Sequence, residues 1–106
     1  MPYTYCVTFR VANQTVGGRS YDERRQSIVE AVRTDGFGYW EETTSFFLVE
    51  SNLDTPTFAR AAAAGLSPAH DMLVAFDPSD MSSAYFGAVK HPEVLASFFR
   101  TAQKLQ

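Results

Sequence analysis

Cysteine is nearly absent from this 106-residue chain, which contains only Cys6. A single cysteine excludes an internal disulfide and any zinc or iron–sulfur site built from several cysteines of one chain. Because its neighbours are apolar, we expect Cys6 to be a buried and unreactive thiol. The two histidines, His70 and His91, are too few for a His-rich metal site within one chain.

Long apolar runs and an excess of positive charge are also missing. No stretch approaches the ~18 consecutive apolar residues of a membrane-spanning helix, and the N-terminus lacks a charged-then-apolar signal pattern. We therefore expect a cytoplasmic protein without membrane contact. Nine basic residues stand against twelve acidic ones, for a net charge of −3. Such a chain lacks the positive field that drives non-specific binding to nucleic acid, although a local basic patch can still bind it.

Apolar residues are plentiful, at 45% of the chain, and the length suits one domain. Residue patterns predict strands over residues 3–12, 37–42, 45–50, 72–76 and 84–89, and helices that begin near residues 21, 56 and 92. This order predicts an α+β fold: a ferredoxin-like βαββαβ sandwich with an extra short edge strand and a C-terminal helix. We expect residues 1–90 to form the ferredoxin-like domain. Residues 91–106 would form the C-terminal helix, packed on the same domain or on a dimer partner.

Local signals mark the ends of the first helix. Ser20 and Glu23 have the spacing of a capping box, in which each side chain accepts from the other residue's backbone N–H. The apolar stripe that follows places Arg24 among the residues expected to point toward water. Asp35-Gly36 is the expected end of this helix.

The other two helices have weaker signals at their ends. Thr55 is the expected N-cap of the second helix, with Pro56 in its first turn. Gly65 is expected to end it in a left-handed conformation. His91 precedes a helix-starting proline, and apolar residues at helical spacing predict that the last helix reaches Leu105.

Two predicted strands, 46–49 and 72–76, carry apolar residues on both faces. Two helices on one side of a sheet cannot bury both faces, and two such aromatic side chains left in water forfeit roughly 3–6 kcal/mol. Exposed patches of this kind mark an interface, so either the last helix folds over the open face or a second copy packs there, and we favour a homodimer. The candidate interface residues are Phe46, Phe47, Tyr85 and Phe86, the last two on a short strand able to pair with an edge of the partner.

Five short features occur in order along the chain: the pair Tyr39-Trp40, the strand from Ser45 to Ser51, the acidic residue Asp54, the strand that follows Asp71, and the pair Phe86-Gly87. Together they resemble the SinR-like family of small bacterial proteins over most of residues 3–90. That family shares the ferredoxin-like fold of the CRISPR adaptation endoribonuclease and of VapD-type toxins.

The resemblance also implies where a metal would lie. In nuclease members of the group, the first strand ends in an aspartate, and one from each subunit holds a divalent cation that needs oxygen ligands. This chain has Arg10 and Asn13 there, a cation and a neutral amide. The acids Asp22 and Glu23 belong to the start of a helix. We therefore expect no metal, no cofactor and no catalytic residue.

The polar end of the first strand permits an anion-binding mouth, doubled in a dimer, because arginine and loop amides suit phosphate or carboxylate groups. Its candidate anion or nucleic-acid contacts are Arg10, Asn13, Gln14, Arg19 and Arg25. The plainer interpretation, which we favour, pairs Arg10 with an acid of the partner strand. The same interpretation places Arg24 and Arg25 on a solvated face of a helix.

Two further pairs have a plain and a functional interpretation. His70-Asp71 at the start of a strand is more typical of a structural turn than of acid–base or metal chemistry. Tyr39-Trp40 has the ring faces that single-strand binders stack on bases, but such residues more often fill a core or an interface.

These features predict a small homodimeric interaction or regulatory module without catalytic activity of its own. Two alternatives stay open. One is a nucleic-acid-directed protein of the toxin or CRISPR-related kind, either a weak metal-dependent endoribonuclease or a binding scaffold, favoured by a continuous basic stripe through Arg10, Arg19 and Arg25. The other is a binder of a small apolar ligand, favoured by an enclosed apolar pocket.

Overall fold

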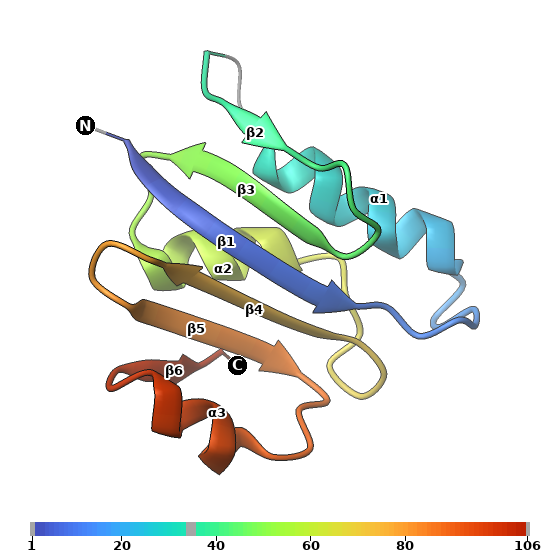
Figure 1. Cartoon of the computed structure of the whole chain (residues 1–106). Coiled ribbons are helices and arrows are strands. Elements are labelled where there is room, and N and C mark those ends of the chain that lie inside the picture. The colour runs from blue at the N-terminus through green and yellow to red at the C-terminus, as the bar shows by residue number, and fades with distance from the viewer. Residues whose placement is uncertain (1, 34–35, 106) are drawn as a thin grey trace.

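The computed structural model describes residues 2–33 and 36–105. In chain order its elements are β1 (Tyr3–Arg10), α1 (Tyr21–Val32), β2 (Tyr39–Trp40), β3 (Phe46–Ser51), α2 (Thr55–Ala63), β4 (Met72–Asp77), β5 (Ser82–Gly87), α3 (Pro92–Phe98) and β6 (Ala102–Lys104). The strands form one sheet in the order β2-β3-β1-β4-β5-β6 (Figure 1). Neighbouring strands are antiparallel, except that β6 runs parallel to β5. The α+β class is confirmed, with six strands where a simple ferredoxin-like sheet has four.

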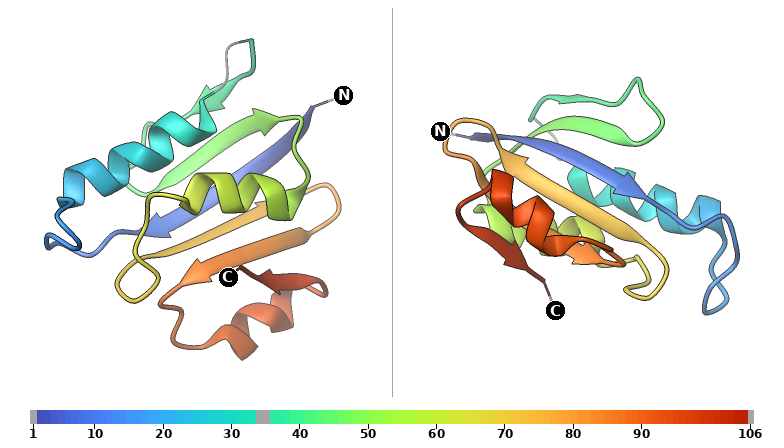
Figure 2. Two further views of the ribbon diagram at one scale, coloured as in Figure 1. Left: turned by 180° about the vertical axis from the view of Figure 1, so that it is seen from behind. Right: turned by 60° about the horizontal axis from the view of Figure 1, so that its bottom comes forward.

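One face of the sheet is covered by α1 and α2 (Figure 2). The side chains of β1 alternate, so that Tyr5, Val7 and Phe9 point into the core beneath these helices. The alanines of α2 let the helix approach the sheet closely, because Ala59 and Ala62 are both fully buried. The core therefore lies between the helices and one face, and no helix of the described residues lies over the opposite face of β1 and β3.

The start of α1 is as predicted, but one residue of its buried stripe is not. Ser20 Oγ accepts from the Glu23 N–H at 3.1 Å, and the Ser20 N–H donates to Glu23 Oε1 at 2.9 Å, which completes the capping box. Arg24, expected in water, is only 1% exposed. The prediction of a solvated Arg24 is wrong because one buried carboxylate and three backbone carbonyl groups accept its hydrogen bonds in the interior. The expected end of this helix includes residue 35, outside the described residues.

Three local predictions in the middle of the chain are also corrected. The strand expected over 37–42 is reduced to the two residues of β2. The N-cap of α2 is Asp54 rather than Thr55, with Asp54 Oδ1 accepting from the Thr57 N–H at 3.0 Å. Gly65 is not among the glycines of positive φ. Its lack of a Cβ matters because the side chain of Ser27 on α1 occupies that space.

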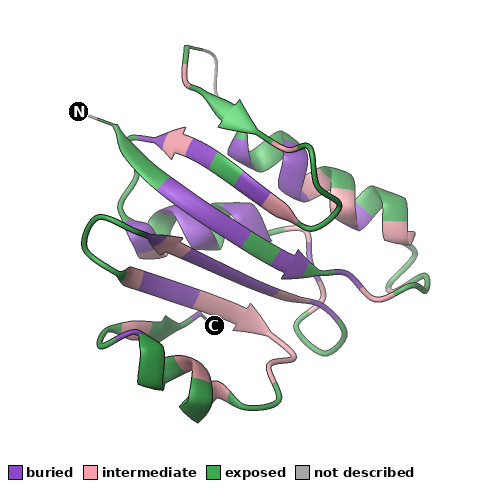
Figure 3. Cartoon of the chain, viewed as in Figure 1, coloured by how far each residue is buried: buried purple, intermediate pink, exposed green. Residues whose placement is uncertain are grey.

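The C-terminal segment is not one helix. α3 ends at Phe98, and β6 then pairs with β5. Phe99 packs against Phe76 with ring centroids 5.2 Å apart, and Leu105 reaches the core. The predicted helix through Leu105 is wrong because strand pairing and these two apolar contacts outweigh helical spacing. Most of α3 itself is exposed (Figure 3), and β6 covers part of the β5 edge that was expected to be open.

Candidate functional site at the end of the first strand

The end of β1 leads into a loop that turns at two glycines. Gly17 and Gly18 have φ of +59° and +80°, the left-handed region that glycine adopts without steric cost. Val16 and Arg19 bridge across this turn with two backbone hydrogen bonds. The sequence places no carboxylate in this loop, yet the fold brings one there from the segment before β4.

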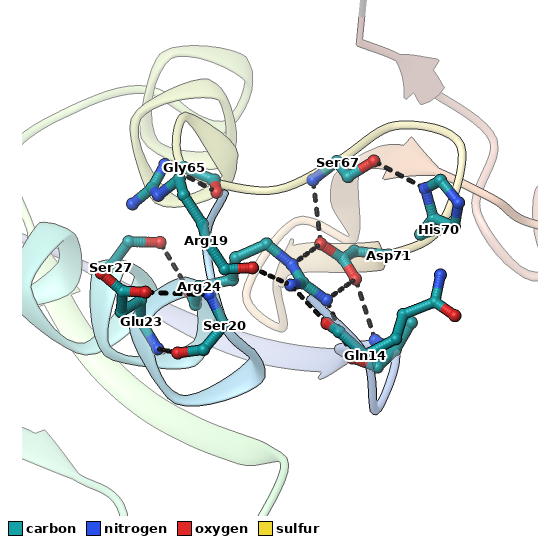
Figure 4. A network of polar contacts seen from close by, with 11 residues as sticks. Gln14, Arg19, Ser20, Glu23, Arg24, Ser27, Gly65, Ser67, His70 and Asp71 are labelled. Atoms are coloured by element: carbon teal, nitrogen blue, oxygen red, sulfur yellow. Dashed lines mark hydrogen bonds and ion pairs between the residues drawn. The ribbon is translucent and has the colours of Figure 1, made fainter. Parts of the chain in front are cut away.

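That carboxylate is Asp71, which is fully buried and bonded from three directions (Figure 4). Its Oδ1 accepts from the Ala12 N–H at 2.9 Å and from Arg24 Nη2 at 3.3 Å. Its Oδ2 accepts from Arg24 Nε at 2.9 Å and from the Ser67 N–H at 2.8 Å. Four donors occupy the two oxygens, so no acceptor position is left for a metal or a substrate.

Arg24 uses the rest of its guanidinium to hold the loop after β1. Its Nη1 donates to the carbonyl oxygens of Gln14 and Arg19, both at 2.8 Å, and its Nη2 donates to the Ala12 carbonyl at 2.8 Å. Together with the two bonds to Asp71, all five N–H groups of the side chain are used. The ion pair therefore ties α1, the glycine loop and the start of β4 into one unit.

The surroundings of Asp71 decide its charge. Burial alone would raise the pKa of this carboxyl, but hydrogen bonds from Arg24, Ser67 and Ala12 and the charge of Arg24 outweigh burial and lower it.

The backbone around Asp71 is also closely packed. Its carbonyl accepts from the Ala88 N–H at 2.8 Å and would collide with any side chain at Gly87, where φ is +91°.

The chemistry available here is structural. Asp71 is ionised, fully paired and shielded from water, which is the state of a structural carboxylate rather than of a general base or a metal ligand. Within residues 2–33 and 36–105, no group of three or more acidic, histidine or cysteine side chains is placed to hold a metal ion. His70 is exposed and its Nδ1 lies 3.0 Å from Ser67 Oγ, in the structural turn that the sequence predicts.

The structure does not bring the candidate anion contacts together. Arg10 pairs with Met72 across β1 and β4 and faces away from the helices. Arg25 lies on the helix side, with its guanidinium 5.7 Å from the Phe9 ring centroid and bonded to the Thr44 carbonyl at 3.0 Å. Arg19 donates to the Gly65 carbonyl at 3.1 Å. The sheet therefore separates Arg10 from Arg25, and the three arginines do not form one stripe.

The remaining candidates at this end are Asn13 and Gln14, which are exposed in the loop. Gln14 contributes its carbonyl to Arg24 rather than a side chain to a site. Within the described part of the chain the ion pairs join Arg24 to Asp71 and His91 to Glu93, so the single chain does not contain the expected pairing of Arg10 with an acid. Arg10 thus keeps its charge exposed at the end of β1.

The candidate interface residues divide between the two faces of the sheet. Phe47 is 1% exposed and belongs to the core, so it offers no surface to a partner. Phe86 also packs against the core, on the helix side. Phe46 alternates with Phe47 along β3, and Tyr85 pairs with Val74, so both point to the uncovered side.

That uncovered side carries neighbouring uncharged side chains, which we call the outer face, and Glu50 of β3 and Arg10 of β1 border it on the same side of the sheet. Leu48 is 38% exposed and lies opposite Cys6 on β1 and Trp40 on β2. The Trp40 ring also approaches Phe46, with centroids 6.5 Å apart. The pKa of the Cys6 thiol is raised by burial and by the charge of Asp77, as expected for an unreactive thiol. The members of the outer face are Thr4, Cys6, Thr8, Trp40, Phe46 and Leu48.

Comparisons with known proteins add no further assignment. No family model, no curated protein and no solved structure matches this chain. No helix among the described residues is long and apolar enough to cross a membrane.

The sequence-based interpretation missed the pair of Arg24 and Asp71, although one signal for it was present. Arg24 precedes Ile28 by four residues and Val32 by eight, so it lies on the same buried stripe of α1. A charged residue on such a stripe requires a buried partner of opposite charge. Its partner could not be identified locally because Asp71 is 47 residues away.

Proposed function

We propose that this chain is a homodimeric interaction module whose outer face is covered by a second copy of itself. In this proposal the segment from β1 to β4 is a ferredoxin-like unit of the SinR-like kind, working in the cytoplasm. The antiparallel order β2-β3-β1-β4 with α1 and α2 on one face supports that assignment. β5, α3 and β6 are then additions at one edge of the unit.

The observation that carries the proposal is the exposure of the outer face. Leu48 and Trp40 are 38% and 39% exposed in the single chain, on the side of the sheet opposite the described helices α1 and α2. Full burial of an exposed side chain of this type contributes about 1.5–3 kcal/mol, and a second copy would supply the part that these half-buried side chains still lack, twice by symmetry. Monomeric proteins rarely leave contiguous apolar patches of this kind in water.

The dimensions of the molecule are compatible with such a dimer. The principal extents are 38 × 35 × 23 Å, so the chain is a flattened body with the sheet across its broad side. A stable interface buries about 800 Å² on each partner, which the broad side can supply. The sheet edges are less suitable, because β6 pairs along β5 and β2 offers only two residues.

Nucleic-acid binding is less well supported. The stripe of arginines that would favour it is divided, with Arg10 on the outer side and Arg25 bonded to Thr44 on the helix side. Arg19 is already engaged with the Gly65 carbonyl. The overall negative charge adds to this argument, since phosphate binding relies on concentrated positive charge.

The dimer is tested by light scattering after size exclusion at micromolar concentration. We expect the wild-type mass to be twice the 11.8 kDa of one chain. Leu48→Lys places a charge in the centre of the outer face and should weaken the dimer by a factor of 100 or more, because a buried unpaired charge costs several kcal/mol. The variant should keep its circular dichroism spectrum, since position 48 is exposed in the single chain.

A matched control uses the same substitution elsewhere. Leu53, 42% exposed, lies in the turn between β3 and α2 and not on the outer face. Leu53→Lys should therefore leave the dimer mass unchanged. A wild-type mass of one chain would refute the proposal, and equal effects of the two substitutions would place the interface elsewhere.

A further inference from the structure

A groove lies between the outward side of β4 and helix α3, beyond the outer face. Its floor is formed by Met72 and Val74 of β4, and its wall by Val94 and Leu95 of α3. Arg10 at the end of β1 and Lys90 in the loop before α3 also line it. The groove has a volume of about 310 Å³, at the small end of the range for sites that take small molecules.

We propose that this groove binds a small amphipathic carboxylate, an aliphatic chain that ends in one carboxylate group. The chain would lie on Met72 and Val74 and against Leu95, where apolar side chains remove it from water. The carboxylate would lie between Arg10 and Lys90, both of which are exposed. Arginine holds a carboxylate with two parallel hydrogen bonds, and lysine adds a point charge.

The charges around the groove favour an anion over a neutral ligand. Among the described residues that line it are Arg10, Lys90 and His91, and none of those described lining residues is acidic. Within the described part of the chain, neither Arg10 nor Lys90 forms an ion pair. The acid nearest to Lys90 in the sequence is Glu93, whose Oε1 lies 3.6 Å from His91 Nδ1 and which does not line the groove. The two cations match the carboxylate end of such a ligand, and the apolar floor matches its aliphatic chain.

Isothermal titration calorimetry with hexanoate, octanoate and decanoate tests the apolar part. Each additional buried methylene group should tighten binding about fourfold until the groove is filled. 1-Octanol has the same chain without the charge, and we expect it to bind at least tenfold more weakly than octanoate. Equal affinity of octanol and octanoate, or no binding of octanoate at millimolar concentration, would overturn the proposal.

Matched double variants test the role of the two cations. Arg10→Gln with Lys90→Gln should weaken octanoate binding at least tenfold, because both charge-assisted contacts are lost. Arg100→Gln with Lys104→Gln removes the same two charge types at exposed positions outside the groove and should leave the affinity unchanged. All four positions are exposed, so both variants should fold. Equal affinities of the two variants would contradict the assignment.

The same variants distinguish a small ligand from a protein partner. The proposal holds independently of the dimer, so the Leu48→Lys variant should bind octanoate with the wild-type affinity even if it is monomeric. If the variant at Arg10 and Lys90 changes the mass in light scattering and not the octanoate affinity, the groove is a contact between copies and the proposal fails.

Discussion

At the scale of the residue, Arg24 shows how completely a buried charge can be satisfied. Its five N–H groups donate to Asp71 and to three backbone carbonyls, and the side chain is 1% exposed. Lysine could not replace it, because an ammonium has three donors and no planar fork to match a carboxylate. A buried ion pair is costly to desolvate, so its stability depends on this complete set of bonds.

Substitution of Arg24 should therefore be far more damaging than substitution of its neighbour. Arg24→Met leaves Asp71 buried without its counterion, and we expect a loss of about 3–5 kcal/mol in the free energy of unfolding. Arg25→Met removes only an exposed bond to the Thr44 carbonyl and ring contacts, and should cost about 1 kcal/mol or less. Urea denaturation measures both, and similar losses would show that the buried pair contributes little.

Residue chemistry could be predicted from the sequence where the partner is nearby. The capping box of Ser20 and Glu23 was predicted because three residues separate the two groups. The partner of Arg24 was not, because nothing local distinguishes Asp71 from the other acids. The inert character expected of Cys6 follows from its apolar neighbours and agrees with its raised pKa. Sequence alone thus predicts short-range polar contacts better than buried pairs that join distant segments.

At the scale of the element, α1 and the segment that follows α2 approach each other closely at Gly65. A Cβ on Gly65 would overlap the hydroxyl and Cβ of Ser27 on α1 and come within 3.2 Å of Arg19 Nη2. Gly65 is therefore needed for the close approach of the segment after α2 to α1. Its role is steric and does not depend on a left-handed backbone.

A pair of complementary substitutions tests this contact. Gly65→Ala should lower the free energy of unfolding by about 1–3 kcal/mol, because the added methyl group overpacks the interface. Ser27→Gly should cost about 0.5–1 kcal/mol through helix propensity and the loss of the Ser27 hydroxyl bond to the Arg24 carbonyl. If Ser27 is the obstacle, the double variant is more stable than the sum of the two losses implies, which thermal or urea unfolding can measure. Strict additivity would contradict the steric account.

Sequence patterns predict some elements of this fold and not others. β1, α1 and β4 were expected near their observed positions because period and end signals agree there. β2 was expected to be longer, and β6 was expected to be helix. Both are short edge strands whose pairing depends on β3 and β5 rather than on their own residues. Helical spacing from Val94 to Leu105 was genuine but was outweighed by the contact of Phe99 with Phe76.

At the scale of the whole molecule, the uncovered side of the sheet has two distinct parts. The outer face over β1, β2 and β3 consists of uncharged side chains bordered by Glu50 and Arg10, and it suits a second copy of the chain. The part over β4 is bordered by α3 and has two cations beside an apolar floor, which suits a small anion. The first part was predicted from strands that carry apolar residues on both faces. The second part depends on where α3 lies, and no local pattern specified that.

The polar network at the end of β1 gives the last prediction, which concerns catalysis by the whole protein. We expect no Mg²⁺-dependent hydrolysis of RNA or double-stranded DNA, because both oxygens of Asp71 are occupied by Arg24 and by the amides of Ala12 and Ser67. Labelled RNA and DNA incubated with the protein and Mg²⁺, with and without chelator, measure this directly. Asp71→Asn is the control, since cleavage that persists in it does not come from this carboxylate. Cleavage by the wild type that chelator stops, fresh Mg²⁺ restores and an Asp71→Asn variant with the wild-type circular dichroism spectrum lacks would mean that the carboxylate leaves Arg24 to bind metal.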